Sequence, residues 1–244
     1  MRSRVLDRLL LTAQVHAIKQ WAPRLRHVTL AGPELAGLAW LPGQHVRLQV
    51  GAAPGPVDWL MGALRAYSVW DYDGETLELI VFDHGDSNGP GAGWARTAQP
   101  GDKLRLLKPE GDFITTRAGY HLLAGEETAQ VAYGAMLRAL PVDARVFGCL
   151  EVDSPGERLD LDQDRNPNRD LHWSYRRGRP AASAQTLVDA VRLLDLPAEP
   201  GMAYLAGEAR TIQLIRRHLV EERHWPRRNV RTKPFWTPGR KGLE

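Results

Sequence analysis

The stretch YHLLAGEETAQVAYGAMLRALPVDARVFGCLEV, residues 120–152, decides the fold. It opens and closes with apolar runs, and between them residues 128–140 place apolar side chains at helical spacing. Two strands that are joined by a crossover helix pair most simply in parallel. The stretch therefore predicts a strand, helix and strand unit of an α/β domain.

The same rhythm continues after a polar loop. The sequence predicts three more strands, at 171–176, 201–208 and 229–236. It also predicts two more helices, at 183–194 and 209–223. We therefore expect residues 118–244 to form a Rossmann-like α/β domain around a parallel sheet.

Upstream of residue 117 the pattern changes to short runs with partial two-residue alternation, bounded by Gly, Pro, Asp or Asn. These runs predict six strands, at 12–22, 26–32, 44–51, 64–72, 76–84 and 102–111. Asp73 and Gly74 lie between two of them and predict a tight hairpin, because glycine readily adopts a positive φ. The pattern favours an antiparallel barrel or sandwich over residues 1–117.

Composition limits the class of protein. The chain has 244 residues, of which 43% are hydrophobic and 25% charged, enough for two domains with buried cores. Cys149 is the single cysteine, so no internal disulfide forms, and no run reaches the ~20 apolar residues of a membrane span. The basic first fifteen residues lack a clear cleavage site, so we expect no signal peptide and a cytoplasmic, monomeric protein. A net charge of +3, spread along the chain, does not indicate nucleic-acid binding.

A Gly-x-Ser-x-Gly match at 85–89 suggests a serine hydrolase with Ser87 as nucleophile. That motif works at a turn between a strand and a helix of a mostly parallel sheet, and here it follows an antiparallel pattern. The available histidines, His218 and His224, fall on a predicted helix and just after it. The serine hydrolase is therefore an alternative and not the preferred function.

Metal sites have little support in the sequence. Asp160, Asp162 and Asp164 alternate as in a calcium loop, but Arg165 and Leu171 stand where that loop needs Gly and Glu. The eight histidines show neither helical His-x-x-x-His pairing nor cysteine partners. We expect no protein-bound metal.

The stretch LRAYSVW, residues 64–70, places a cation beside an aromatic ring. On a strand, Arg65 and Tyr67 project from one face and Ser68 from the other. This combination suits a flat, anionic cofactor such as a flavin nucleotide, with the ring stacked on Tyr67 and the pyrophosphate bound by Arg65. An ordinary strand with a surface arginine and a half-buried tyrosine is the alternative interpretation.

The glycine-rich loop VFDHGDSNGPGAGWA, residues 81–95, strengthens the flavin hypothesis. It predicts a short helix that begins near Gly93, Trp94 and Ala95, whose unpaired N–H groups would favour phosphate. In the second half, residues 120–126 and 202–208 are two apolar strands that each end in Ala-Gly-Glu. Strand ends of a parallel sheet are where ligands collect, although simple turn glycines explain the pattern equally well.

From about Val15 to its end the chain resembles the siderophore-interacting protein family, which are flavin-dependent ferric-siderophore reductases with a ferredoxin-reductase-like architecture. The resemblance rests on five segments in register, namely RAYS at 65–68, VFDHGD with GWA and PGD after it, YHLLAGEETA, YLAGEA with IRRHLVEER, and KPFWTPGRKG at 233–242. It implies an FAD-binding β-barrel over 1–117 and an α/β NAD(P)H-type domain over 118–244.

The resemblance also implies site residues. Those expected to bind the cofactor are Arg65, Tyr67, Ser68, His84, Gly85, Gly93, Trp94, Ala95, Glu126, Thr128 and Trp236. Those expected to bind substrate are Arg231, Lys233 and Arg240. Glu126 stands where the family more often has Asp, and the SNGP insertion leaves contacts of Ser87 and Asn88 undefined. No side chain is expected to act as a nucleophile.

The implied function is electron transfer from NADH, NADPH or reduced ferredoxin, through FAD, to Fe(III) in a siderophore, with release of Fe(II). A non-enzymatic carrier of siderophore or flavin is a second alternative beside the serine hydrolase. Ferredoxin is a possible protein partner; neither nucleic acid nor membrane insertion is expected.

Overall fold

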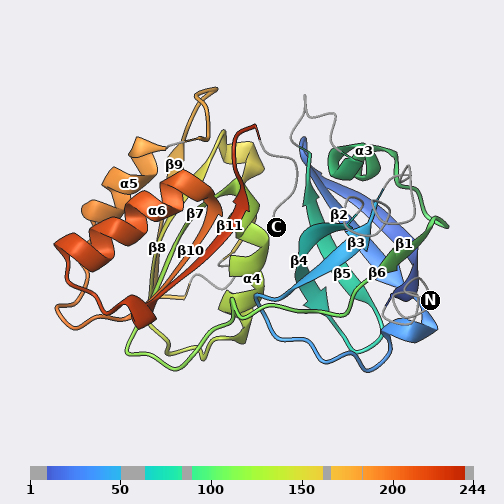
Figure 1. Ribbon diagram of the computed structural model, residues 1–244, viewed down its shortest axis with the longest axis horizontal. Coiled ribbons are helices and arrows are strands. Elements are labelled where there is room, and N and C mark those ends of the chain that lie inside the picture. Colours follow the sequence, from blue (N-terminus) through green and yellow to red (C-terminus); the bar gives the residue numbers. More distant parts are fainter. Residues whose placement is uncertain (1–9, 51–63, 84–89, 162–165, 183, 240–244) are drawn as a thin grey trace, which may run out of the picture. The chain divides into compact units, whose positions relative to one another are not determined.

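The computed structural model divides the chain into two compact units, Met1–Ile114 and Thr115–Glu244 (Figure 1). It describes residues 10–50, 64–83, 90–161, 166–182 and 184–239. Each unit has its own hydrophobic core. Within the described residues, no helix is both long and apolar enough to span a membrane.

The first unit is a closed antiparallel barrel with the strand order β1-β2-β5-β4-β3-β6. Its strands are β1 (Leu11–Ala22), β2 (Leu25–Ala31), β3 (His45–Gln49), β4 (Leu64–Tyr72), β5 (Leu77–Phe82) and β6 (Lys103–Leu106). In the described part of this unit they are accompanied by the short helices η1 (Pro33–Leu35) and α3 (Pro90–Thr97). The β1 strand pairs with both β2 and β6, and register shifts at Val15/Ala17 and Gln20/Ala22 interrupt its pairing with β2. Such bulges increase the local bend and twist that closure requires.

The predicted hairpin joins β4 to β5 through a four-residue loop, since Tyr72 pairs with Leu77. Gly74 has the expected positive φ of 99°. The Asp73 side chain accepts hydrogen bonds from the Glu75 and Thr76 N–H groups, at 2.9 and 2.6 Å, and from the Thr76 hydroxyl at 2.7 Å. These bonds lower the pKa of Asp73 to about 2. The loop is thus held by the Asp73 side chain together with a backbone bond from the Asp73 N–H to the Thr76 carbonyl at 3.4 Å.

The second unit contains a five-stranded parallel sheet in the order β11-β10-β7-β8-β9, which confirms the predicted fold class. Its strands are β7 (His121–Glu126), β8 (Val146–Val152), β9 (Arg169–Tyr175), β10 (Met202–Glu208) and β11 (Val230–Trp236). Its helices are η2 (Glu127–Ala129), α4 (Gln130–Ala139), η3 (Pro155–Glu157), α5 (Gln185–Arg192), α6 (Ala209–Arg217), the π-helical turn η4 (His218–Glu222) and η5 (Arg227–Asn229).

Helices cover both faces of this sheet. The α5 and α6 helices lie on one face and α4 on the other (Figure 1). Burial on both faces explains why β7 reads as a continuous apolar run and not as an alternating one. Pro234 lies in β11, which is an edge strand, where a missing N–H costs no central ladder bond.

Strand order reverses between β7 and β10, because the chain first adds β8 and β9 on one side of β7 and then β10 and β11 on the other. Gly125 permits the close approach at this point. A Cβ at position 125 would overlap the Ala206 carbonyl oxygen and lie 2.7 Å from Ala129 Cβ and 2.9 Å from the Tyr133 hydroxyl. The Tyr133 hydroxyl lies 2.7 Å from the Ala124 oxygen and accepts from the Ala206 N–H at 3.0 Å.

Gly125→Ala should therefore lower the free energy of unfolding by about 3 kcal/mol, because neither the backbone of β10 nor the helix start can move aside cheaply. Gly119→Ala is the matched control, since a Cβ there would meet nothing within 4 Å. Urea denaturation of the two variants measures the difference. Equal stability of the two variants would contradict the packing argument.

Candidate functional site

The β4 strand carries Arg65 and Tyr67 on one face, as the alternation predicts. They pair with Leu48 and Val46 of β3, whose side chains belong to the barrel core. Tyr67 is partly buried against that core, and burial raises its pKa well above the ordinary value, although Arg65 opposes the shift. Tyr67 is therefore a neutral phenol at physiological pH. Ser68 is buried on the opposite face, paired with His45.

The first turn of α3 lies against both of these side chains. The Tyr67 hydroxyl donates to the Gly91 carbonyl at 3.3 Å, and its ring lies 5.5 Å from that of Trp94. A Cβ on Gly91 would lie 3.0 Å from the Tyr67 hydroxyl oxygen and 3.5 Å from Arg65 Cγ. Gly91 is thus a site residue that the sequence analysis missed. The available signal was its place directly after Pro90, because proline favours the first position of a helix.

The start of α3 corrects one prediction. The helix begins at Pro90, so its first-turn N–H groups lie around Gly91, whereas Trp94 and Ala95 fall inside the helix. The Gly93 carbonyl accepts from the Thr97 hydroxyl at 2.9 Å. Ala95 is buried, and its carbonyl accepts from Arg26 of β2. His84, Gly85, Ser87 and Asn88 lie outside the described residues.

These residues suit a flavin nucleotide. A neutral aromatic ring and a guanidinium stand side by side on β4, and the first turn of a helix with a glycine lies against them. The ring offers a stacking surface, while the guanidinium and the helix N–H groups offer donors to a diphosphate. Gly91 keeps the helix start close enough for these groups to act on one ligand.

In the second unit, Glu126 ends β7 in a buried position with 1% of its surface exposed. Its carboxylate accepts the Thr128 N–H at 2.9 Å, the Thr128 hydroxyl, and Trp236 Nε1 at 3.0 Å. Burial, and next the charge of Glu127, raise the pKa of Glu126 from 4.5 to about 7, although these hydrogen bonds oppose the rise. Three predicted site residues, Glu126, Thr128 and Trp236, are thus brought together.

Two further carboxylates and one guanidinium lie at the same edge of the sheet. Glu127 binds Arg176 through both of its oxygens, and both residues are buried. Glu151 of β8 pairs in register with Glu126 and is fully buried, with Arg176 Nη1 at 3.7 Å from its Oε1. Among the described residues, neither Glu151 oxygen has a hydrogen-bond partner, and burial raises the pKa of Glu151. The sequence analysis assigned no role to Glu151 or Arg176.

The Ala-Gly-Glu at 206–208 ends β10, and the Ala-Gly-Glu at 124–126 ends the neighbouring strand β7. Glu208 accepts the Arg210 and Thr211 N–H groups at 2.8 Å each, and so caps α6. Glu126 likewise caps η2, because its side chain accepts the Thr128 N–H. Both motifs are therefore helix caps as well as strand ends. A capping carboxylate at the strand end is a function that the sequence analysis did not consider.

Of the residues predicted to bind substrate, Arg231 and Lys233 lie two positions apart in β11 and therefore project from the same face of this strand. Lys233 pairs with Ala206 in the ladder with β10. Arg240 lies outside the described residues.

The competing sites gain no support. Within the described part of the chain, no three His, Cys, Asp or Glu side chains are grouped to hold a metal ion. His218 uses both ring nitrogens, since Nδ1 lies 2.7 Å from Glu222 Oε2 and Nε2 accepts from Arg223 Nε at 3.1 Å.

Comparisons with known proteins give the family. Residues 118–239 match the siderophore-interacting protein family, and residues 60–113 match its siderophore-interacting FAD-binding domain. The ferric vibriobactin reductase ViuB of Vibrio cholerae is 32% identical over 72% of this chain. That match spans 65% of the length of ViuB, so less than two thirds of this relative is covered.

Solved structures agree on the architecture. A siderophore utilization protein from T. fusca has a TM-score of 0.81 and 27% identity, over 96% of this chain and 95% of its own. Ferredoxin-NADP+ reductase from Plasmodium falciparum has a TM-score of 0.77 over 93% of this chain and 96% of its own. At 14% identity, the second likeness concerns the fold alone.

The raised pKa of Glu126 makes stability depend on pH. The folded state holds this proton up to about pH 7, whereas the unfolded chain releases it near 4.5, so stability falls as pH rises between these values. The free energy of unfolding should fall by up to about 3 kcal/mol between pH 4 and pH 8 from this group. Urea denaturation of Glu126→Gln, which cannot titrate there, should show a smaller fall. Glu199→Gln, at an exposed loop position, should keep the wild-type profile, and an unchanged profile in Glu126→Gln would argue against the assignment.

Proposed function

Because the chain belongs to the siderophore-interacting protein family, we propose that it is a flavin-dependent oxidoreductase that reduces Fe(III) held by a siderophore and releases Fe(II). The observation that carries this proposal is the placement of Arg65, Tyr67 and the first turn of α3 around one face of β4. These residues fall within the part of the chain that matches the FAD-binding domain. Similarity to ViuB, a ferric vibriobactin reductase, supports the same reaction class.

In this proposal the side chains of the protein bind and orient the FAD and the ferric siderophore. When bound, FAD supplies the chemistry, since it takes up two electrons and releases them one at a time. Tyr67 offers a neutral ring for stacking, and Arg65 with the α3 start holds the diphosphate. Ser68, His84 and Gly85 are proposed as further contacts of the cofactor. Gly93, Trp94 and Ala95 support the site from inside α3.

The basic residues near the end of the chain are proposed to attract the substrate. A ferric siderophore that carries negative charge would be drawn toward Arg231 and Lys233 on β11, together with Arg240. Trp236, whose Nε1 donates to Glu126, is proposed as a cofactor contact. Fe(II) is a poorer match than Fe(III) for hard oxygen ligands, so reduction releases the metal.

The electron donor is proposed to be NADH, NADPH or reduced ferredoxin. We also propose the division of labour expected from the sequence, with FAD bound by residues 1–117 and the donor side in residues 118–244. A monomeric, cytoplasmic protein is the corresponding proposal for assembly and location.

The visible spectrum of the purified protein tests the function. A flavin spectrum that bleaches anaerobically with a donor, and recovers on adding a ferric siderophore while Fe(II) appears, is the expected result. A colourless protein that does not take up FAD would sink the proposal. Activity that depends on Ser87 would favour a hydrolase, and siderophore binding without flavin bleaching would favour a carrier.

Tyr67→Ala should weaken FAD binding by about tenfold or more, because it removes the stacking surface. Tyr67→Phe is the matched control, since it keeps the ring and loses only the hydrogen bond to Gly91. Titration of the apoprotein with FAD, followed by flavin fluorescence, measures both. If Tyr67→Ala binds FAD as tightly as Tyr67→Phe, the ring does not stack on the flavin.

Lys233→Ala should raise the apparent KM for an anionic ferric siderophore several-fold, because one attracting charge is lost. The effect should shrink at high salt and for a neutral ferric chelate. Lys103→Ala, an exposed lysine of the barrel, changes the net charge equally and should leave KM unchanged. A rise of the same size for the neutral chelate would argue against electrostatic attraction by Lys233.

A further inference from the structure

The edge of the sheet between β7 and β10 is where this architecture collects a dinucleotide. The strand order reverses there, and the diphosphate normally lies on backbone N–H groups where a strand passes into its helix. In this chain the two relevant passages run from β7 into η2 and α4, and from β10 into α6. Whether a nicotinamide dinucleotide fits can be read from these two helix starts.

Carboxylates of the chain itself occupy both helix starts. Glu208 accepts the Arg210 and Thr211 N–H groups at 2.8 Å each, and also the Thr211 hydroxyl at 2.8 Å. Glu126 accepts the Thr128 N–H at 2.9 Å. These N–H groups are the donors that a diphosphate would need. Both carboxylates are 1% exposed, so neither can leave its cap without opening the packing around it.

The space between the two strand ends is also filled. Gly207 has a φ of 130°, and a Cβ there would lie 2.6 Å from Glu126 Oε1. The Glu126 side chain therefore lies directly against the backbone of β10. In a dinucleotide-binding turn, glycines leave this space so that the backbone can approach the diphosphate. Here the glycine makes room for a carboxylate instead.

The buried side chains behind these caps offer no favourable charge to a diphosphate. Glu127 and Glu151 are buried next to Glu126, at the carboxyl ends of β7 and β8. Arg176 faces this group, and both of its Nη atoms bind Glu127. A diphosphate placed here would lose its water and meet carboxylates in a poorly screened environment.

We propose that Glu126 and Glu208 are specificity-determining residues that exclude the diphosphate of NADH or NADPH from this edge of the sheet. The reductant of the chain is then an electron carrier that presents no diphosphate, and reduced ferredoxin is the donor of that kind. This inference rests on the proposed reductase function and narrows its donor.

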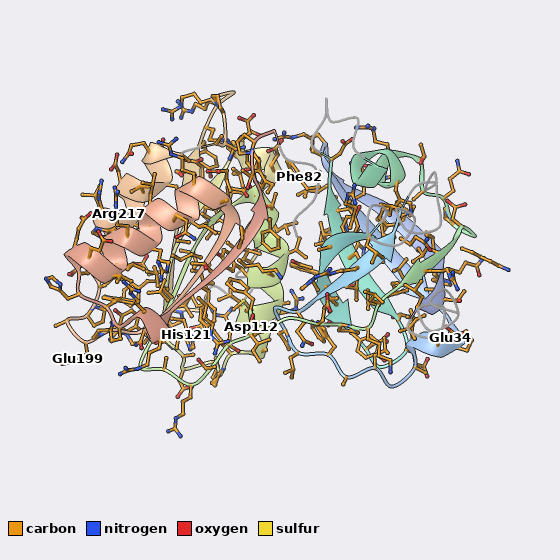
Figure 2. The ribbon with its side chains drawn as sticks, in the orientation of Figure 1. Glu34, Phe82, Asp112, His121, Glu199 and Arg217 are labelled. Carbon is orange, nitrogen blue, oxygen red and sulfur yellow. The ribbon has the colours of Figure 1, made fainter. Side chains whose placement is uncertain are left out.

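Isothermal titration of the FAD-loaded protein with NAD+ and NADP+ at low salt tests the exclusion. The wild type should bind both with a Kd weaker than about 1 mM. At pH 8, where Glu126 is ionised, Glu126→Gln combined with Glu208→Gln removes two charges and leaves uncharged amide caps that a diphosphate can displace more easily, so it should tighten binding by about tenfold or more. Glu199→Gln is the matched control, because it removes one exposed charge just before β10, near His121 at the opposite end of the sheet (Figure 2), and should change the Kd less than twofold.

Two results would overturn the exclusion, namely a wild-type Kd in the micromolar range, or a double variant that folds and gains no affinity. Circular dichroism checks folding, and if the double variant is unfolded the single Glu208→Gln variant decides by the same criterion, with an expected gain of about threefold. The proposed function is tested separately by reducing the flavin with dithionite, removing the excess anaerobically, and following Fe(II) formation after the ferric siderophore is added. Failure there overturns the reductase itself, whereas tight binding of NADP+ with normal Fe(II) formation overturns only the exclusion.

Discussion

A missing side chain at position 125 allows the two central strands of the second unit to meet. With no Cβ on Gly125, the Ala206 carbonyl lies against β7, and the Tyr133 hydroxyl reaches between the strands. That hydroxyl accepts from the Ala206 N–H and lies within hydrogen-bonding distance of the Ala124 and Tyr204 carbonyls. One buried phenol on α4 thus satisfies polar groups of both strands. The register of β7 with β10, and with it the juxtaposition of the two Ala-Gly-Glu ends, depends on this contact.

Local pattern was enough to predict the fold class. The apolar run at 120–126 is buried on both sides, and the helical spacing after it becomes α4, because periodicity reports which faces of an element are covered. Local pattern alone left a barrel and a sandwich open, because closure depends on pairing between β1 and β6, which are far apart in sequence; the family resemblance implied the barrel, which the structure confirms. The start of α3 was misplaced because glycines suggested a loop as far as Gly93, whereas Pro90 begins the helix.

The candidate site was predictable only in part, because some of its contacts depend on tertiary placement and not on local sequence pattern. The alternation of Arg65 and Tyr67 on one strand face follows from strand geometry alone. The contact of Gly91 with both side chains requires tertiary placement of α3, which no local rule supplies. Likewise, Glu126 and Trp236 are identified by family resemblance, but the bond between them joins β7 to β11 across β10. Glu151 and Arg176 carried no sequence signal, because their burial arises from the register of β8 and β9.

No residue separates β7 from η2 or β10 from α6, and this restricts where members of the family can gain or lose residues. Glu126 is followed at once by η2, and Glu208 at once by α6, so each glutamate belongs to a strand and to a helix start simultaneously. An insertion at either junction would move the carboxylate away from the N–H groups that it caps. Changes in loop length are better tolerated where residues are exposed, such as residues 177–180 between β9 and α5. We therefore expect relatives to differ in length there, while the two junctions keep their length.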